Sequence, residues 1–362
     1  MVVGYSLGNR GNQEEDIQVL GEDEPDVLTY SKAVTIVLSR MCRNKCPYCA
    51  FSRRDNVTVP YSMIKWAKKA RAVGVREAIF AAGERADKFA HVRALLDLWG
   101  FDSYIDYIYT VCELGFLEGV IPVLEVGFLS PSEMRRVSEV VSLFKIMLDS
   151  VNPSRFDQVY PNSPGKKIEL RLKLLEWASK LKVPIVTGLL VGIGESKSHK
   201  KEMLNTIGKL HQEYGMIHEV VLQNFIPEPG TAFYRRNPPN KKVMLETAEM
   251  ALEILPKDIS VIVPLEMNPD YEDFIRAGIR DLGRIQEGRG LITPQTDISM
   301  EKIEQLAEKL GFRIQQRFPL RKSFIQANKY SSKLGQVFDS YSYKIKKHDQ
   351  EKLKEAKLTS GD

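Results

Sequence analysis

The sequence predicts an α/β fold, a TIM-type (β/α) barrel that is followed by a C-terminal helical extension. Short apolar, β-branched segments alternate along the chain with longer segments that have helical spacing. The short segments are apolar almost throughout, which is typical of parallel strands that are buried on both faces. Seven or eight such units within about 260 residues favour a barrel over an open sheet. A doubly wound sheet is the alternative, and it is disfavoured because no GxGxxG motif follows the first expected strand.

Seven segments have the composition of buried strands, and they are residues 35–40, 77–82, 120–126, 143–148, 184–191, 218–225 and 258–264. The segments between them are expected to be helices. Residues 62–74 illustrate the pattern, because apolar side chains recur there at helical intervals and Gly74 provides a stop. Residues 168–181 repeat the pattern and end before Pro184.

Composition divides the chain into four parts. Residues 1–30 are polar and acidic and are expected to form a loosely attached lead-in, and residues 31–298 hold the barrel. Residues 299–345 contain a helical pattern that would close the barrel. Residues 346–362 carry many charges and few apolar anchors, so we expect a solvated, flexible tail.

The charge pattern excludes some classes of partner. The chain has 52 basic and 47 acidic residues, and the basic residues are spread rather than gathered in a patch, so no nucleic-acid partner is expected. No apolar run approaches the roughly 20 residues that a membrane-spanning helix needs. The first residues also lack the basic-then-apolar order of a signal peptide. We therefore expect a cytoplasmic protein with no membrane contact.

Three of the four cysteines lie close together in the sequence. Cys42, Cys46 and Cys49 form a CxxxCxxC motif directly after the first expected strand. A loop of this kind can supply three thiolates to an iron–sulfur cluster, and three ligands would leave one iron open to a substrate or cofactor. In a barrel this loop lies on the C-terminal face, where active sites are found.

A zinc site or a non-catalytic iron–sulfur binding module is the alternative of another class. Structural zinc normally takes a fourth Cys or His ligand, and the next histidine in the sequence is His91. The zinc reading is therefore disfavoured. Cys112 lies in an apolar helical segment and is expected in the core.

With Tyr48 directly before its last cysteine, the CxxxCxxC motif resembles that of the radical S-adenosylmethionine (radical SAM) superfamily. The resemblance implies one [4Fe-4S] cluster on Cys42, Cys46 and Cys49. It also implies that S-adenosyl-L-methionine binds the open iron through its amino and carboxylate groups. Reduction would then break the S–C5′ bond, and the resulting 5′-deoxyadenosyl radical would abstract hydrogen from a substrate.

The same resemblance implies a set of cofactor-binding residues. Tyr48 matches the aromatic residue that shields the cluster and offers a backbone contact to adenine. Gly83 and Glu84 match a GGE-like turn that receives the methionine amino group, although the first glycine of that turn is Ala82 here. Asp149 resembles the acid that binds the ribose hydroxyls.

Two further matches concern later segments. Arg171 sits where biotin-synthase-like members place the arginine that pairs with the methionine carboxylate. Gly188, Gly192 and Glu195, in GLLVGIGE, match a GxIxGxxE element that packs beside adenine. Each residue taken alone has a plainer interpretation, as a turn or packing glycine, a solvated charge or a cap of a turn.

A closer resemblance, from about Leu28 to Leu282, is to the deazaflavin-precursor synthase subunit that acts second. It is carried by segments such as FAAGERAD, NSPGK, VPIVTGLLVGIGE and VVLQNFIPEPGTAF. The resemblance implies a radical SAM lyase or synthase that forms 7,8-didemethyl-8-hydroxy-5-deazariboflavin. Its substrate would be a tyrosine-derived adduct of 5-amino-6-ribitylaminouracil, supplied by a partner radical SAM subunit. A reductant protein such as ferredoxin or flavodoxin would deliver the electron.

The chain departs from this family's pattern where the substrate should bind. The expected third, fourth and seventh strands and the last barrel loop, which includes Gly283 and residues up to Gly290, carry other residues than usual. The substrate-side candidates are Glu125, Gln223, Asn224, Arg284 and Arg289. A radical SAM paralogue of the deazaflavin or aminofutalosine type, acting on a different small substrate, therefore remains the alternative. Sulfur insertion is disfavoured, because Cys112 alone cannot hold a second cluster.

Overall fold

The computed structural model describes residues 24–52, 57–149, 153–268, 271–286, 300–335 and 337–339. Its sheet has the order β7-β6-β5-β4-β3-β2-β1-β8, with β9 paired to β1. Every ladder in it is parallel. The strands are β1 (Val27–Ser39), β2 (Glu77–Ala82), β3 (Ile121–Glu125), β4 (Leu143–Lys145), β5 (Ile185–Val191), β6 (Ile217–Asn224), β7 (Ser260–Ile262), β8 (Asp281–Gln286) and β9 (Arg313–Gln316).

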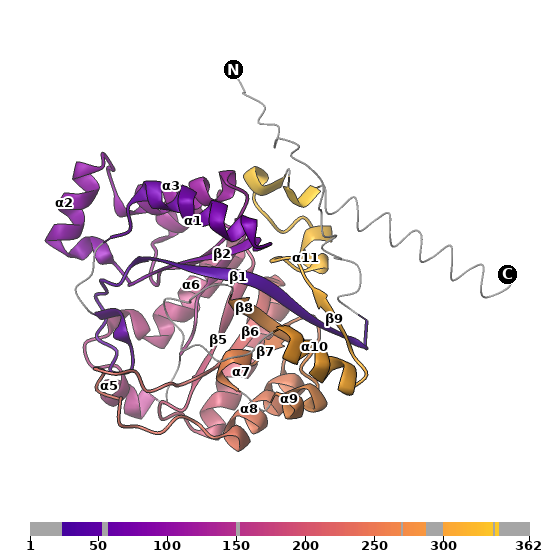
Figure 1. Ribbon diagram of the computed structural model, residues 1–362. Helices are drawn as coiled ribbons and strands as arrows, with labels where there is room; N and C mark the ends of the chain where they lie inside the picture. Colours follow the sequence, from indigo (N-terminus) through magenta and orange to yellow (C-terminus); the bar gives the residue numbers. More distant parts are fainter. Residues whose placement is uncertain are drawn as a thin grey trace.

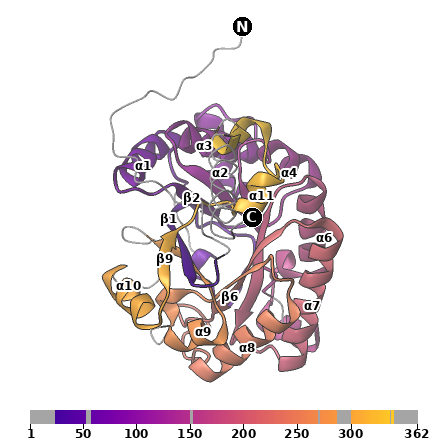
Figure 2. The same ribbon diagram turned by 90° about the vertical axis from the view of Figure 1, so that its right-hand side faces the viewer.

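The sheet curls into a nearly closed barrel (Figure 2). Strands β7 and β8 face one another at the seam, where a Cβ on Gly283 would lie only 2.6 Å from the side chain of Ile262. Glycine at this position therefore permits the close approach of the last two strands. The predicted TIM-type barrel is confirmed.

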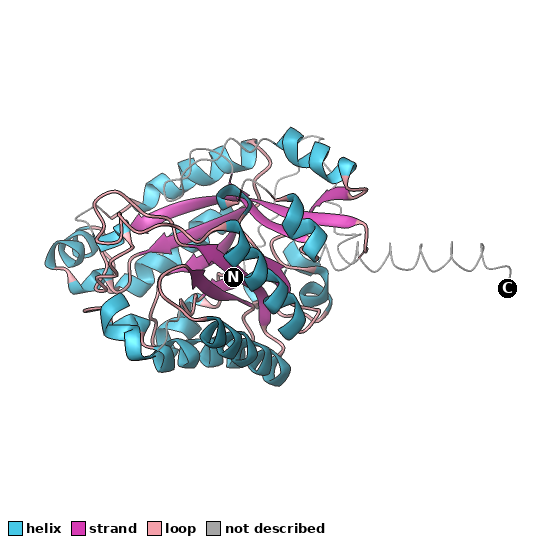
Figure 3. Cartoon of the chain, turned by 90° about the horizontal axis from the view of Figure 1, so that it is seen from below, coloured by secondary structure: helices cyan, strands magenta, loops and turns pink. Residues whose placement is uncertain are grey.

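Helices cover the outside of the strands (Figures 1 and 3). They are α1 (Pro60–Ala72), α2 (Ala90–Leu98), α3 (Tyr104–Leu117), α4 (Pro131–Val137), α5 (Phe156–Val159), α6 (Ile168–Lys180), α7 (Lys197–Tyr214), α8 (Lys241–Ile254), α9 (Glu272–Ala277), α10 (Met300–Lys309) and α11 (Lys322–Gln326). Ser130 starts α4 with a capping box, and Gly215 ends α7 in a left-handed conformation. Among the helices of the described residues, none has the length and apolar character needed to cross a membrane.

All seven expected strands are present, but two expectations about the ends of the barrel are wrong. Residues 281–286, expected to lead into and begin the last barrel loop, form β8. The expected boundary at residue 30 falls inside β1, which begins at Val27 because β9 pairs with residues 27–30. The closing segment is therefore not only helical. Polar residues in β8 and β9 hide both strands from a search for apolar runs.

The C-terminal segment closes the end of the barrel opposite the cysteine loop. Its apolar side chains, which include Phe318, Leu320 and Phe324, pack against inward side chains of the strands, such as Val123 and Val186. In Figure 2, α11 lies over this end of the strands. Side chains therefore fill the barrel interior at this end, and a cavity can exist only toward the other end, where the carboxyl ends of the strands lie.

A buried ion-pair network lies between this packed end and the cavity. The Arg284 Nε atom is 2.7 Å from Glu77, and the same guanidinium also pairs with Glu219. Arg317, from the C-terminal segment, pairs with Glu219 at 2.9 Å and with Asp281 at 2.9 Å. Buried charges are tolerated only when they are paired in this way. Because the partners come from different elements, the network joins β2, β6, β8 and the C-terminal segment.

Candidate active site

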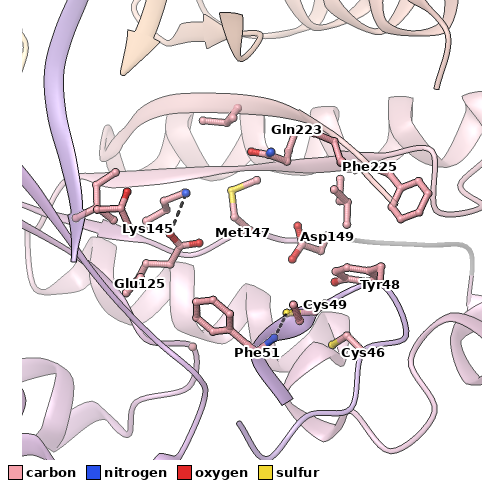
Figure 4. A pocket seen from close by; sticks show the side chains of 18 of the residues that line it. Cys46, Tyr48, Cys49, Phe51, Glu125, Lys145, Met147, Asp149, Gln223 and Phe225 are labelled. Carbon is pink, nitrogen blue, oxygen red and sulfur yellow. Dashed lines mark hydrogen bonds and ion pairs between the residues drawn. The ribbon is translucent and has the colours of Figure 1, made fainter. Parts of the chain in front are cut away.

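A cavity of about 420 Å³ lies at the carboxyl ends of the strands. Its walls include the three clustered cysteines and the last residues of β2 to β6 (Figure 4). The volume lies in the range of small-molecule sites. Because carboxyl ends of parallel strands meet at one face of a barrel, residues that are far apart in sequence converge here.

Each of the three cysteine sulfurs has a hydrogen-bonding group beside it. The backbone N–H of Glu84 donates to the Cys42 Sγ atom at 3.2 Å. The N–H of Phe51 donates to the Cys49 Sγ atom at 3.4 Å (Figure 4). The hydroxyl of Ser163 lies 3.5 Å from the Cys46 Sγ atom. Such outer contacts are typical of sulfurs that carry negative charge as metal ligands.

The protein surroundings alone do not favour ionisation of the Cys42 and Cys49 thiols. Burial raises the pKa of Cys42 and raises that of Cys49 to about 12, and the nearby Cys46 adds to both shifts. A bound metal centre supplies the positive charge that makes thiolates stable in such a place. Within the described ranges, no three Cys, His, Asp or Glu side chains gather tightly enough to hold a single ion. Three cysteines on one CxxxCxxC loop match the ligand set of an iron–sulfur cluster, whereas structural zinc normally takes four protein ligands.

Glu84 is buried at the turn after β2 and joins several parts of the site. Its carboxylate accepts hydrogen bonds from Arg43 Nε at 2.8 Å, Arg171 Nη2 at 3.2 Å and the backbone N–H of Phe128 at 3.1 Å. Its side chain is only 3% exposed. Glu84 is thus not a solvated acid, and its position is set by two arginines.

Glycines make room around Glu84. A Cβ on Gly127 would lie 2.6 Å from the Glu84 carboxylate, and a Cβ on Gly165 would lie 1.7 Å from it. Gly83 has a similar constraint, because its Cβ would lie 2.1 Å from the carbonyl oxygen of Met41 in the cysteine loop. The turn at residues 83 and 84 can therefore lie directly against the cysteine loop.

Arg171 projects from α6 into the site rather than to the solvent. Its Nε atom donates to the carbonyl oxygen of Gly165 at 2.7 Å, and its Nη2 atom reaches Glu84. The residue is 5% exposed and lines the cavity. The plainer interpretation of a helix-surface charge is wrong for this residue.

Asp149 lies four residues beyond Lys145, the last residue of β4. Lys145, Met147 and Asp149 all line the cavity (Figure 4). Its backbone has a positive φ of 44°, which is unusual for a residue with a side chain. The Asp149 carboxylate pairs with Lys166, and its carbonyl oxygen accepts a hydrogen bond from the Tyr160 hydroxyl. Two contacts therefore hold this acid at the cavity wall.

Tyr48 lies between aromatic rings beside the cysteines. Its ring meets Tyr160 edge-on with a centroid distance of 6.0 Å, and Phe233 lies 6.4 Å away. The N–H of Phe233 also donates to the carbonyl oxygen of Pro47 at 2.9 Å. Tyr48 lines the cavity, so an apolar surface shields the cysteine loop on this side.

The glycines after and within β5 have local structural tasks. A Cβ on Gly188 would lie 1.9 Å from the carbonyl oxygen of Val221, so this glycine permits close packing of β5 and β6. The Glu195 carboxylate accepts hydrogen bonds of 2.8–3.0 Å from the backbone N–H groups of Gly192, Ile193 and Gly194, and these bonds fix the shape of its own loop. Gly192 and Glu195 line a second, outer pocket and not the main cavity.

Comparison with known proteins relates the chain to enzymes of one family. Residues 36–207 match the Radical SAM superfamily model. The 7,8-didemethyl-8-hydroxy-5-deazariboflavin synthase of Archaeoglobus fulgidus is 33% identical over 320 residues, which cover 87% of this chain and 97% of that protein. The enzyme of the same name from Methanothermobacter thermautotrophicus is 33% identical over 308 residues, which cover 82% and 93%. The chain belongs to the 7,8-didemethyl-8-hydroxy-5-deazariboflavin synthase family. It is a radical SAM enzyme.

Solved structures agree on the fold. The [FeFe]-hydrogenase maturase HydG has a TM-score of 0.68 at 14% identity, with 89% of this chain and 71% of that chain covered. Methylornithine synthase (PylB) has a TM-score of 0.62 at 13% identity, with 86% and 88% covered. At such low identity these similarities support the barrel architecture alone.

This deazariboflavin synthase family member has a charged pair in the wall of its cavity, at residues that include a substrate-side candidate. Lys145 Nζ lies 2.9 Å from Glu125 Oε2, and both side chains line the cavity. Figure 4 shows the two side chains pointing toward one another. Glu125 was expected from the sequence, whereas Lys145 was not. Its position two residues before Met147 on an expected strand was the signal that could have found it.

The other substrate-side candidates differ in how free they are. Gln223 donates to the Met267 Sδ atom at 2.9 Å, and Asn224 forms reciprocal amide hydrogen bonds of 2.9 Å with Asn268. Arg284 lines the cavity, but it lies on β8 and its guanidinium is held by the buried acids. Arg289 lies outside the described residues.

Two more residues of the family site were missed from the sequence. Ser163 touches Cys46, and Lys166 pairs with Asp149. Both belong to the NSPGK segment, which supported the family resemblance but received no role. The segment became informative only once the fold had brought it to the cysteine loop.

Proposed function

We propose that this enzyme forms 7,8-didemethyl-8-hydroxy-5-deazariboflavin from a tyrosine-derived adduct of 5-amino-6-ribitylaminouracil. Membership of the synthase family supports this substrate. The observation that carries the proposal is the arrangement of three cysteine sulfurs on one cavity wall, each beside a hydrogen-bonding group. When bound to these thiolates, a [4Fe-4S] cluster would cleave S-adenosyl-L-methionine reductively and supply the 5′-deoxyadenosyl radical.

The cofactor would be held by residues on both sides of the cysteine loop. Cys42, Cys46 and Cys49 would be the iron ligands. Glu84 and Arg171 form a buried acid–base pair near Cys42, and such a pair is suited to a ligand that carries both an ammonium and a carboxylate group.

The nucleoside part would lie against other walls. Tyr48 offers an aromatic face beside the cysteines, and Asp149 offers a carboxylate at the end of β4. We propose contacts of Tyr48 with adenine and of Asp149 with the ribose hydroxyls. Gly188, Gly192 and Glu195 would act indirectly, by shaping the wall and the loop that follow β5.

The substrate would occupy the remaining, charged part of the cavity. Glu125 and Lys145 together present an acceptor and a donor, which suits the imide edge or the hydroxyls of a ribityluracil compound. Gln223 and Asn224 add amide groups, and Arg284 adds a charge that is already neutralised. The packed end of the barrel, opposite the cysteine loop, would exclude water from the bottom of the cavity and hold the reacting carbon near the cofactor.

The proposed partners follow from the chemistry. A radical SAM partner subunit would supply the adduct, and a small electron-transfer protein such as ferredoxin or flavodoxin would reduce the cluster. We propose that the enzyme works in the cytoplasm, where these partners would be available.

The test is anaerobic reconstitution followed by two assays. About four irons per chain, together with 5′-deoxyadenosine release from S-adenosyl-L-methionine, would support the radical SAM site. Incubation with the adduct should then produce the deazaflavin chromophore. Zinc binding without cleavage would overturn the proposal as a whole.

One observation favours a second candidate. The charged pair of Glu125 and Lys145 lies where the chain departs from the family's sequence pattern. This departure favours, as the second candidate, a paralogue that carries out radical chemistry on another small substrate. Cofactor cleavage without the chromophore, when the adduct is present, would decide for the paralogue.

A further inference from the structure

The segment Asn162–Lys166 ties the separate parts of the cofactor site together. The N–H of Lys45, in the cysteine loop, donates to the carbonyl oxygen of Asn162 at 3.3 Å. The N–H of Gly165 donates to the Asn44 Oδ1 atom at 2.9 Å, and the carbonyl oxygen of Gly165 accepts from Arg171 at 2.7 Å. One short segment thus contacts both the cysteine loop and the buried arginine.

Lys166 ends this segment and directs its ammonium group at Asp149. The two side chains are 14% and 11% exposed, and the ion pair joins Lys166 Nζ to Asp149 Oδ2. Both residues line the cavity. Since the pair engages Oδ2, the Oδ1 atom can accept a hydrogen bond from a ligand in the cavity.

Asp149 needs such support because of its backbone. Its φ of 44° is a left-handed conformation, and the residue lies beyond the end of β4 at Lys145. Its N–H keeps one long hydrogen bond, of 3.4 Å, to the carbonyl oxygen of Gly188 in β5. Tyr160 binds the Asp149 carbonyl oxygen, and Lys166 binds its carboxylate. The stretch from Tyr160 to Lys166 therefore holds the acid at both its main chain and its side chain.

We propose that Lys166 is a positioning residue of the cofactor site, which orients the Asp149 carboxylate for the ribose hydroxyls of S-adenosyl-L-methionine. This inference rests on the proposed function, which assigns the ribose contact to Asp149. Lys166 limits the rotation of the carboxylate, so that the acceptor oxygen already faces the ligand before binding. The residue acts through Asp149 and not on the reacting atoms.

The experiment measures the dissociation constant of S-adenosyl-L-methionine for the anaerobically reconstituted holoenzyme by equilibrium dialysis. Lys166→Met should weaken binding roughly tenfold or more, as expected when a charge-assisted contact is lost. Lys166→Arg should stay near the wild-type value. Lys173→Met removes an exposed lysine of α6 and serves as the matched control, with unchanged binding expected.

Two comparisons separate this role from a general structural one. An S-adenosylmethionine analogue without the ribose 2′- and 3′-hydroxyls should bind Lys166→Met and wild type with similar affinity. In the Asp149→Asn background, Lys166→Met should add little further loss, because the two residues act as one unit. Iron content should equal that of the wild type.

The inference is overturned if Lys166→Met binds S-adenosyl-L-methionine like wild type, if the loss is as large for the deoxy analogue, or if iron content falls. If the methionine variant does not fold, Lys166→Gln is measured with the same expectations. Cleavage of S-adenosyl-L-methionine by wild type, together with normal binding by the variant, would sink this inference and leave the proposed function intact.

Discussion

The backbone N–H of Glu84 lies 3.2 Å from the sulfur of Cys42, although 42 positions separate the two residues. The contact joins the first strand's loop to the second strand's turn. It requires glycine at position 83, where a side chain would collide with Met41. The same turn carries the carboxylate that Arg43 and Arg171 hold, so Cys42 and the charged pair are positioned by one piece of backbone.

Cys46→Ala should abolish cluster assembly. Two protein ligands are too few to retain a cubane cluster, and the four-iron content per chain of wild type should be lost. Iron analysis and the visible absorption of the reconstituted protein measure this directly. Cys112→Ala is the control, because Cys112 is buried in α3 and should leave the iron content unchanged. Release of 5′-deoxyadenosine by Cys46→Ala would contradict the ligand assignment.

Ser163→Ala should leave the iron content unchanged but lower the reduction potential of the cluster. In the structure the Cys46 S–H donates to the Ser163 hydroxyl oxygen at 3.5 Å. A cluster-bound Cys46 thiolate would instead accept a hydrogen bond from this hydroxyl, and such a bond stabilises the reduced, more negative state. Anaerobic redox titration followed by electron paramagnetic resonance measures the shift. Ser163→Thr keeps the hydroxyl and should keep the potential close to that of wild type. An unchanged potential in the alanine variant would show that this contact carries no weight.

Glu125→Gln and Lys145→Met should each reduce product formation by about tenfold or more while leaving substrate-free cofactor cleavage within about twofold. Both residues line the cavity, and their side chains pair with one another at 2.9 Å. Parallel assays of 5′-deoxyadenosine and of the chromophore separate the two effects. Equal losses in both assays would place the pair in the cofactor site instead.

Arg317→Met should destabilise the fold by about 3–5 kcal/mol, because it leaves Glu219 and Asp281 with reduced compensation in the barrel interior. Urea unfolding gives the free energy. Arg313→Met offers a matched control, since Arg313 makes exposed ion pairs with Glu24 and Asp26, which should contribute little. Similar stability of the two variants would contradict the importance of the buried network.

His218 should make stability depend on pH between 6.5 and 4.5. Burial lowers the pKa of His218 to about 4 in spite of the adjacent Glu219, and the Arg321 N–H donates to its Nε2 atom at 2.9 Å. Below pH 6.5 the unfolded chain therefore binds a proton that the folded protein does not yet accept. The free energy of unfolding should fall by up to about 2–3 kcal/mol across this window.

His218→Gln should remove most of this dependence. Glu219 does not interfere in the same window. Burial alone would raise its pKa, but Arg284 and Arg317 hold the pKa well below the usual 4.5. Urea unfolding of cluster-free protein at pH 6.5 and 4.5 measures the difference for wild type and variant. An equally steep fall in the variant would assign the pH dependence to other groups.

The barrel and the position of the cysteine loop at the cavity could be predicted because their signals are local. Buried parallel strands are apolar along their whole length, as in residues 77–82, and the three cysteines share one loop. Strand β8 escaped because Asp281 and Arg284 make it look polar. Its charges are acceptable only because acids and an arginine from β2, β6 and the C-terminal segment surround them.

By itself, the sequence determined the order of the first seven strands with the helices between them, the CxxxCxxC loop and the likeness to a radical enzyme family. Tertiary structure alone decided which distant groups meet, such as Ser163 with Cys46 and Lys166 with Asp149. It also decided that Glu195 serves its own loop and that Arg284 belongs to a buried network. The physical reason is that parallel strands align their carboxyl ends in space regardless of how much chain lies between them.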